Sequence, residues 1–301
     1  MKKILLYFLC LAQLGFAQQI KVLSIEKINE PGEKGYFYPK FSPSADYLLL
    51  TQINYKGLVQ YSVTQKTTKI INEDLGAGYD VQISDDGSTI LYKKIEMINN
   101  LRHNSLVTQK LTTNSKITLV ANTRENITGK LIKSLPVYVK GKKMVKNSTL
   151  SKTIPQYLIA IEDRKMVLYK NGVRIELTPN GADKSYIWPS ISPDEKRIVY
   201  TVSGKGTYIA NIDGTNVKFI GKLSAPKWAG NKYIIGMNDI DDGEKLISSS
   251  LKIISIDGKI NEKLDTPKGI NAMYPTASAD GSKIAFNTDK GEVYILNVEL
   301  K

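Results

Sequence analysis

The chain has 301 residues, and its 42 Lys and Arg against 29 Asp and Glu give a formal net charge of +13. An apolar content of 42% is ordinary for a folded protein and argues against global disorder. The single histidine argues against a Ser-His-Asp triad and against most zinc or manganese sites.

Residues 1–17 have the pattern of a secretory signal peptide. Two lysines precede an apolar stretch at 4–14, and Gly15 and Ala17 supply the small residues of a cleavage site. An uncleaved membrane anchor and lipidation at Cys10 are the alternatives. We expect cleavage after Ala17, no transmembrane segment thereafter, and a periplasmic or secreted protein of a Gram-negative bacterium. Because Cys10 is the only cysteine, the mature protein must fold without disulfides.

From residue 19 onward the sequence predicts short strands joined by tight turns. A phrase recurs at Tyr38-Pro39, Trp188-Pro189 and Tyr274-Pro275, and each copy leads into an alternating apolar stretch. A unit of about 40 residues built of strands and turns is typical of a β-propeller. We predict six units, opening near residues 35, 80, 135, 188, 225 and 274, the third of them irregular.

The sixth predicted unit ends one strand short, at Val298. An alternating segment at 19–25 precedes the first unit and can supply the missing strand. Closure of this kind removes two exposed sheet edges. The sequence therefore predicts an all-β protein in which residues 18–301 form one six-bladed β-propeller, its ring closed by the N-terminal strand. The alternative is that the first residues form a loose tail.

The recurring phrases resemble the repeats of the TolB-type propeller family, whose unit reads roughly Pro-x-aromatic-Ser-Pro-Asp-Gly before a strand. The resemblance spans most of residues 36–300, is close at Tyr38, Trp188 and Tyr274, and nearly vanishes in the third unit. The resemblance implies an exported protein, because members of the family are mostly periplasmic or exported. It also implies a binding role, because many members are non-catalytic binding scaffolds. Other members precede a serine-hydrolase domain or act as polysaccharide lyases.

Residues beside the repeat proline begin the innermost strand of each predicted unit, so they should surround one mouth of the channel. Aromatic side chains with polar tips suit a binding surface there. The alternative is a structural wedge between blades. We predict a ligand-binding rim formed by Tyr38, Asp80, Trp188 and Tyr274, with Leu135 and Ala225 completing the ring.

The positive charge is concentrated between residues 97 and 161, where eleven Lys and Arg accompany a single acid, Glu125. Such a stretch suits an anionic partner such as lipopolysaccharide, an acidic glycan or an acidic protein. The alternative is a solvated face. Nucleic acid is not expected, because aromatic residues are not interleaved with the basic ones. The predicted basic patch consists of Lys130, Lys133, Lys140, Lys142, Lys143 and Lys146.

The sequence contains no catalytic motif, and we expect no cofactor and no metal site. His103 lies in a predicted loop and is not expected to act as a base. The sequence therefore predicts a monomeric, non-enzymatic protein that binds a protein or an anionic envelope partner. The alternative is a carbohydrate-active enzyme of the polysaccharide lyase type, or a glycan-binding protein.

Overall fold

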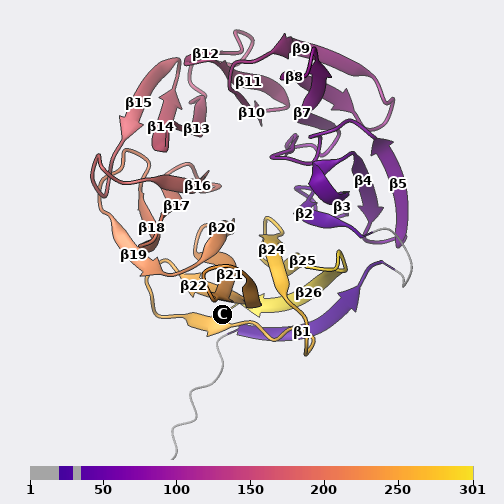
Figure 1. The fold of residues 1–301 in the computed structure, drawn as a ribbon, viewed down its shortest axis with the longest axis vertical. Coiled ribbons are helices and arrows are strands. Elements are labelled where there is room, and N and C mark those ends of the chain that lie inside the picture. Colours follow the sequence, from indigo (N-terminus) through magenta and orange to yellow (C-terminus); the bar gives the residue numbers. More distant parts are fainter. Residues whose placement is uncertain (1–19, 30–34, 301) are drawn as a thin grey trace, which may run out of the picture.

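The computed structural model describes residues 20–29 and 35–300, which form antiparallel sheets around a central channel (Figure 1). The predicted signal peptide at 1–17 lies outside the described residues. Within the described residues one 3-10 turn, η1 (Ile53–Tyr55), interrupts the β-structure. Among the described residues, no helix has the length and apolar character needed to cross a membrane.

Seven sheets follow one another around the ring, and each is one blade. Each of the first six blades is built from one continuous stretch of chain, because short turns join strands that are adjacent in the sheet. The strands of the first three blades are β2 (Phe37–Phe41), β3 (Tyr47–Thr51), β4 (Leu58–Ser62) and β5 (Thr67–Asn72); β6 (Gln82–Ile83), β7 (Thr89–Ile98), β8 (Leu101–Lys110) and β9 (Lys116–Thr123); and β10 (Ile127–Ile132), β11 (Leu135–Lys140) and β12 (Lys143–Val145).

The fourth blade has three strands, and the remaining three blades have four each. Their strands are β13 (Tyr157–Glu162), β14 (Lys165–Lys170) and β15 (Val173–Leu177); β16 (Tyr186–Ile191), β17 (Arg197–Val202), β18 (Gly206–Asn211) and β19 (Lys218–Gly221); β20 (Ser224–Ala229), β21 (Tyr233–Asp241), β22 (Leu246–Ser255) and β23 (Asn261–Lys263); and β24 (Ala272–Ala277), β25 (Lys283–Thr288), β26 (Val293–Leu300) and β1 (Ile20–Lys27).

The serine and aspartate of the recurring phrase build the turn between the first and second strands. In the second blade Ser84 Oγ donates to Asp86 Oδ1 at 2.5 Å and accepts from the backbone N–H of Thr89 at 2.9 Å. The bond from Ser84, followed by those from the backbone and side chain of Ser88, lowers the pKa of Asp86 to about 2. The phrase is thus a structural turn. We call the end of the ring that carries these turns the lower rim and the opposite end the upper rim.

The prediction of six blades is wrong, because the described residues form seven. The predicted third unit joined β11 of the third blade to the three strands of the fourth. Neither of these blades carries the Pro and Ser-Asp signals. Their first turns instead use Lys133-Ser134 and Asp163-Arg164, all four at positive φ. Such two-residue hairpin turns favour glycine or asparagine, so these residues give no turn signal in the sequence.

The fourth blade lacks a counterpart of the strand that begins the other blades. Lys142, in the turn after β11, places its Nζ 3.4 Å from Asp163 Oδ2, in the turn after β13. Since β11 runs opposite to β10, this contact means that β13 also runs opposite to β10. Lys130 of β10 reaches past the fourth blade, and its Nζ lies 2.9 Å from Glu195 Oε1 of the fifth.

The core lies between facing blades. Every residue of β3 is buried, and β25 is buried from Ile284 to Thr288, because neighbouring sheets cover both faces of these strands. Outer strands are exposed along much of their length and include apolar side chains such as Ile70 of β5, 67% exposed. Continuous apolar runs therefore mark the second strand of a blade.

The N-terminal strand closes the ring, as predicted. β1 pairs antiparallel with β26 from Ile20 opposite Leu300 to Lys27 opposite Tyr294. Ile20 is 1% exposed and belongs to the core that the sixth and seventh blades share. The first and last described strands therefore share one sheet, and β26 is not left as a sheet edge.

Candidate binding site at the upper rim of the channel

A bulge in the innermost strand shapes the upper rim in four blades, and Asp80 gives a fifth blade the same left-handed backbone. The register of β2 slips between Phe37 and Lys40, and equivalent slips occur in β16, β20 and β24. A bulge of this kind redirects a side chain at the cost of backbone strain. The residues at this position share a left-handed backbone: Tyr38 (φ 52°), Asp80 (φ 54°), Trp188 (φ 52°), Ala225 (φ 48°) and Tyr274 (φ 51°).

The structure thus gives five of the six predicted rim positions one common backbone geometry. The sixth, Leu135, was placed wrongly. It begins β11 directly after the turn that follows β10, so it lies at the lower rim. The misplacement has the same cause as the wrong blade count, since Leu135-Pro136 imitates the repeat phrase in the second strand of a blade.

Four tyrosine rings meet at the upper rim, and we call them the tyrosine cluster: Tyr38, Tyr55, Tyr79 and Tyr274. The ring of Tyr38 stacks on Tyr55 with centroids 4.4 Å apart and meets the tilted ring of Tyr274 at 4.5 Å. Tyr55 contacts Tyr79 edge-on at 5.2 Å. These side chains come from three blades, so the cluster forms only when the ring is assembled.

Buried groups behind the cluster hold its backbone. The amide of Tyr38 donates to Asn287 Oδ1 at 3.0 Å, and the amide of Tyr274 contacts Met237 Sδ at 3.1 Å. Burial raises the pKa of Tyr38 to about 12, helped by its hydrogen bond to Tyr55, and burial likewise raises that of Tyr274 to about 12. Both phenols therefore stay neutral at physiological pH.

The cluster ends in an exposed ring with a cation over it. Tyr79 is 50% exposed, and Lys93 Nζ lies 4.8 Å from its ring centroid. The same ammonium donates to the carbonyl of Ile127 at 3.2 Å. Burial lowers the pKa of Lys93. This arrangement is a cation–π contact at the edge of the channel.

The other two predicted rim residues lie outside the cluster. Trp188 is 42% exposed, and it makes no ring contact with another aromatic side chain in the described part of the chain. Asp80 is exposed and accepts a hydrogen bond from Gln82 Nε2 at 2.9 Å. The structure therefore brings together Tyr38 and Tyr274, adds Tyr55 and Tyr79, and leaves Trp188 on another part of the rim.

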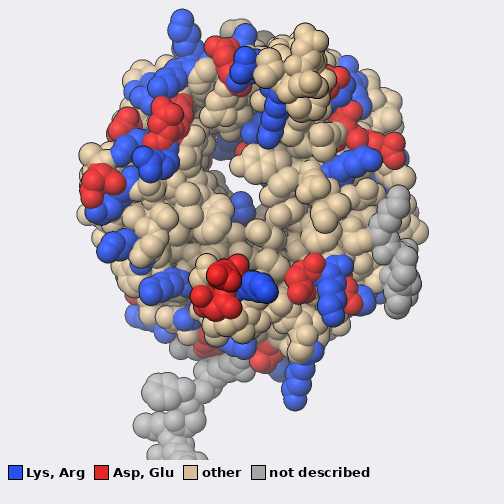
Figure 2. All heavy atoms as spheres, in the orientation of Figure 1, with Lys and Arg blue, Asp and Glu red and all other residues tan. Residues whose placement is uncertain are grey.

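Apolar side chains extend the cluster outward over the first two blades. The long hairpin of β7 and β8 exposes Met97 (63%), Ile98 (37%) and Leu101 (45%). Ile53, 69% exposed, lies in η1 beside Tyr55. We call Ile53, Met97, Ile98 and Leu101 the apolar rim. Figure 2 shows one face of the ring, where largely uncharged surface surrounds the opening and charged side chains gather toward the periphery.

The six lysines of the predicted basic patch do not share one face. Lys133 lies in the turn at the lower rim, whereas Lys142 lies in the turn at the upper rim. Three of the six each pair with a single acid: Lys130 with Glu195, Lys140 with Glu125 at 3.5 Å and Lys142 with Asp163. Lys143 and Lys146 occupy β12 and the segment after it. The structure divides the predicted patch between both rims.

His103 lies in strand β8, opposite Glu96, and not in a loop as predicted. The turn is confined to Asn99-Asn100, both at positive φ, and β8 begins at Leu101. The ring Nδ1 of His103 lies 3.0 Å from the carbonyl of Leu101. Within residues 20–29 and 35–300, no group of three or more His, Cys, Asp and Glu side chains is close enough to hold a metal ion.

No model of a known protein family matches this sequence, and no curated protein matches it. Several solved structures have the same fold. A putative TolB from Agrobacterium tumefaciens is 16% identical with a TM-score of 0.57, covering 89% of this chain and 91% of that one. An oligogalacturonate lyase in complex with manganese is 13% identical with a TM-score of 0.52, covering 90% and 79%.

The TolB of Acinetobacter baumannii is 14% identical with a TM-score of 0.50. The alignment covers 88% of this chain but only 54% of that TolB. At these identities the likeness shows the β-propeller fold alone. The neighbours thus include TolB proteins, in line with the resemblance of the repeats, and an oligogalacturonate lyase.

Proposed function

We propose that this protein is an exported, non-enzymatic binding protein that docks a protein partner on the upper rim of its propeller. The observation that carries the proposal is the tyrosine cluster, in which rings from three blades meet beside the exposed apolar rim. Tyrosine and methionine are enriched in protein interfaces, where rigid rings give a large contact area at little entropic cost. TolB proteins are among the structures that share this fold.

Replacing two rings of the cluster tests this proposal. Tyr38→Ala with Tyr55→Ala removes a stacked pair, and we expect the partner's Kd to rise about 10- to 100-fold, as for paired aromatic hot spots. Alanine is compatible with the strained backbone, because Ala225 adopts it at the equivalent position. Pull-down from envelope extracts of the source bacterium identifies the partner, and calorimetry with the purified pair measures the Kd.

Phe219→Ala is the matched control for this experiment. Phe219 is a 52% exposed aromatic residue in the outer strand β19, away from the channel. Its loss should leave the Kd within about twofold, since truncation outside a hot spot is nearly neutral. Equal weakening by Phe219→Ala, or no weakening by the tyrosine pair, contradicts docking on the upper rim.

A glycan-processing role is the alternative. Lysines approach the channel beside the tyrosine cluster, and a uronic acid could pair its carboxylate with a lysine and stack its ring on a tyrosine. We propose that this chain has no lyase activity, since lyases need a positioned base. Incubation with oligogalacturonate should release no unsaturated product, with or without added manganese. Turnover that a chelator or His103→Ala abolishes would refute the proposal, and binding of the glycan without turnover would identify a glycan-binding protein.

A further inference from the structure

Lys40 occupies an unusual place on the inner wall of the channel. It lies in β2, two residues after the bulge, and its side chain is half-buried. The Nζ atom donates to the carbonyl of Val81 at 2.5 Å. In the part of the chain that the structure describes, no carboxylate lies within ion-pair distance of this ammonium. A partly desolvated cation without a counter-ion is costly.

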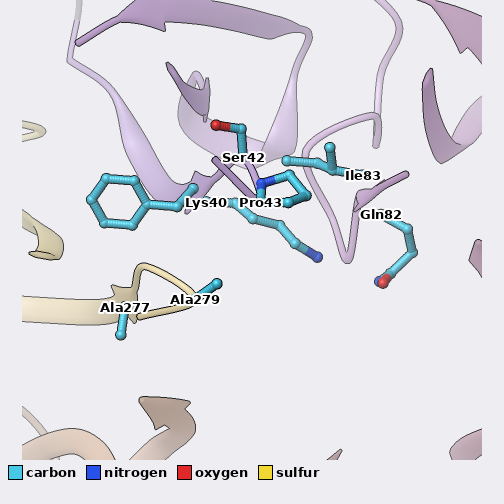
Figure 3. Close-up of a pocket in the computed structure, with 8 residues that line it drawn as sticks. Lys40, Ser42, Pro43, Gln82, Ile83, Ala277 and Ala279 are labelled. Atoms are coloured by element: carbon cyan, nitrogen blue, oxygen red, sulfur yellow. The ribbon is translucent and has the colours of Figure 1, made fainter. Parts of the chain in front are cut away.

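A hollow of about 280 Å³ adjoins Lys40 near the lower rim, between the seventh, first and second blades. Its wall includes the hydroxyl-bearing Ser42, the amide-bearing Gln82 and the small residues Ala277 and Ala279. Figure 3 shows the Lys40 amine extending into the open space between Gln82 and the turn that carries Ala279. The space is large enough for a small organic anion beside the amine.

The charges around Lys40 leave this cation incompletely compensated. Desolvation by burial lowers the pKa of Lys40 to about 8, and nearby Lys227 of β20 adds to the effect. Asp80, which precedes β6, opposes it. The other packed elements present neutral groups, Gln82 from β6 and Ala277 from β24. An added negative charge would therefore interact favourably with two lysines, Lys40 and Lys227, and unfavourably with one carboxylate, Asp80.

We propose that the hollow beside Lys40 is a binding site for an oxyanion group, a carboxylate or a phosphate, which enters from the lower rim. Lys40 supplies the charge and directed N–H donors. The Ser42 hydroxyl already donates to Asp46 and the Gln82 amide to Asp80, so recognition of the anion depends on Lys40. Lys227 adds attraction along the channel. The site is separate from the tyrosine cluster and does not depend on the proposed partner docking there, so each can fail alone.

Titration of the isolated protein with citrate and, separately, with phosphate tests the site by calorimetry, with glucose as the neutral control. We expect saturable binding of at least one anion at pH 7 and none of glucose. The anion that binds distinguishes the carboxylate from the phosphate source. Lys40→Met should weaken binding at least about 10-fold, while Lys205→Met, in the upper-rim turn of the fifth blade, should leave it unchanged. No saturable binding of either anion refutes the site.

The pH dependence separates a role of the charge from a merely structural role of Lys40. Between pH 7 and pH 9.5 the wild type should lose about 10-fold or more in affinity, because an amine with a pKa of about 8 becomes neutral over this range. Lys40→Arg should bind at both pH values, since arginine stays charged. Equal pH dependence in wild type and Lys40→Arg, or full binding by folded Lys40→Met, overturns the proposal. The double variant Tyr38→Ala with Tyr55→Ala should leave the anion affinity and its pH dependence unchanged.

Discussion

Deleting β1, residues 20–27, is expected to abolish folding to a stable monomer. The deletion removes buried Ile20 and every hydrogen bond that β26 makes on that side, from Leu300 to Tyr294. The lost strand contributes a free energy comparable with the whole stability of a typical domain, about 5–15 kcal/mol. We expect aggregation or loss of the cooperative unfolding transition, measured by size-exclusion chromatography and by urea denaturation.

A permuted chain is the control for this deletion. Because Ile20 lies opposite Leu300, a two-residue turn can join residue 300 to residue 20 and convert β26 and β1 into a hairpin. Moving residues 20–27 to the C-terminus in this way should restore a monomer with near wild-type stability. A deleted chain as stable as the wild type would show that closure of the ring is not needed.

Phe286→Ala is expected to lower the free energy of unfolding by about 3–5 kcal/mol, the range for removing a buried aromatic ring from a core. Phe286 is fully buried in β25, where its ring stacks on Tyr294 with centroids 5.3 Å apart. Neighbouring strands are hydrogen-bonded on both sides and cannot collapse into the cavity. Urea unfolding of the purified variant measures the change.

Phe219→Ala is the comparison for that variant, because the same atoms are removed from a 52% exposed side chain. Its ring contacts Tyr208 edge-on at 5.3 Å, so we expect a loss of about 1 kcal/mol. If both variants lose the same free energy, the packing between the sixth and seventh blades does not carry the stability assigned to it.

Local sequence signals account for the parts of the fold that were predicted. The proline phrase, the Ser-Asp turn and the alternation of apolar residues all act within a few residues, and they located five blades. The closing strand could be inferred because the last unit lacked one. The third and fourth blades could not be separated, since the hairpin turn at Asp163-Arg164 adopts positive φ without glycine.

The sequence predicted only two of the four tyrosines of the binding site. Tyr38 and Tyr274 follow from the repeat, but Tyr55 joins them from the link after β3 and Tyr79 from the link before β6. Contacts between blades depend on the closed ring and leave no spacing pattern. Tyr79 directly precedes Asp80, a predicted rim position, and this adjacency was the one usable signal. No sequence signal pointed to Lys40, because its isolation from carboxylates arises only in the assembled channel.

Site-specific photo-crosslinking tests the central claim, docking on the upper rim, most directly. A photoreactive residue replaces Tyr79 at the upper rim, the exposed Asp85 in a lower-rim turn, or the exposed Val173 on an outer strand. After capture of the partner identified by pull-down, we predict a crosslinked band from position 79 and none from positions 85 and 173. A band from position 85 or 173 with none from 79 would contradict the account.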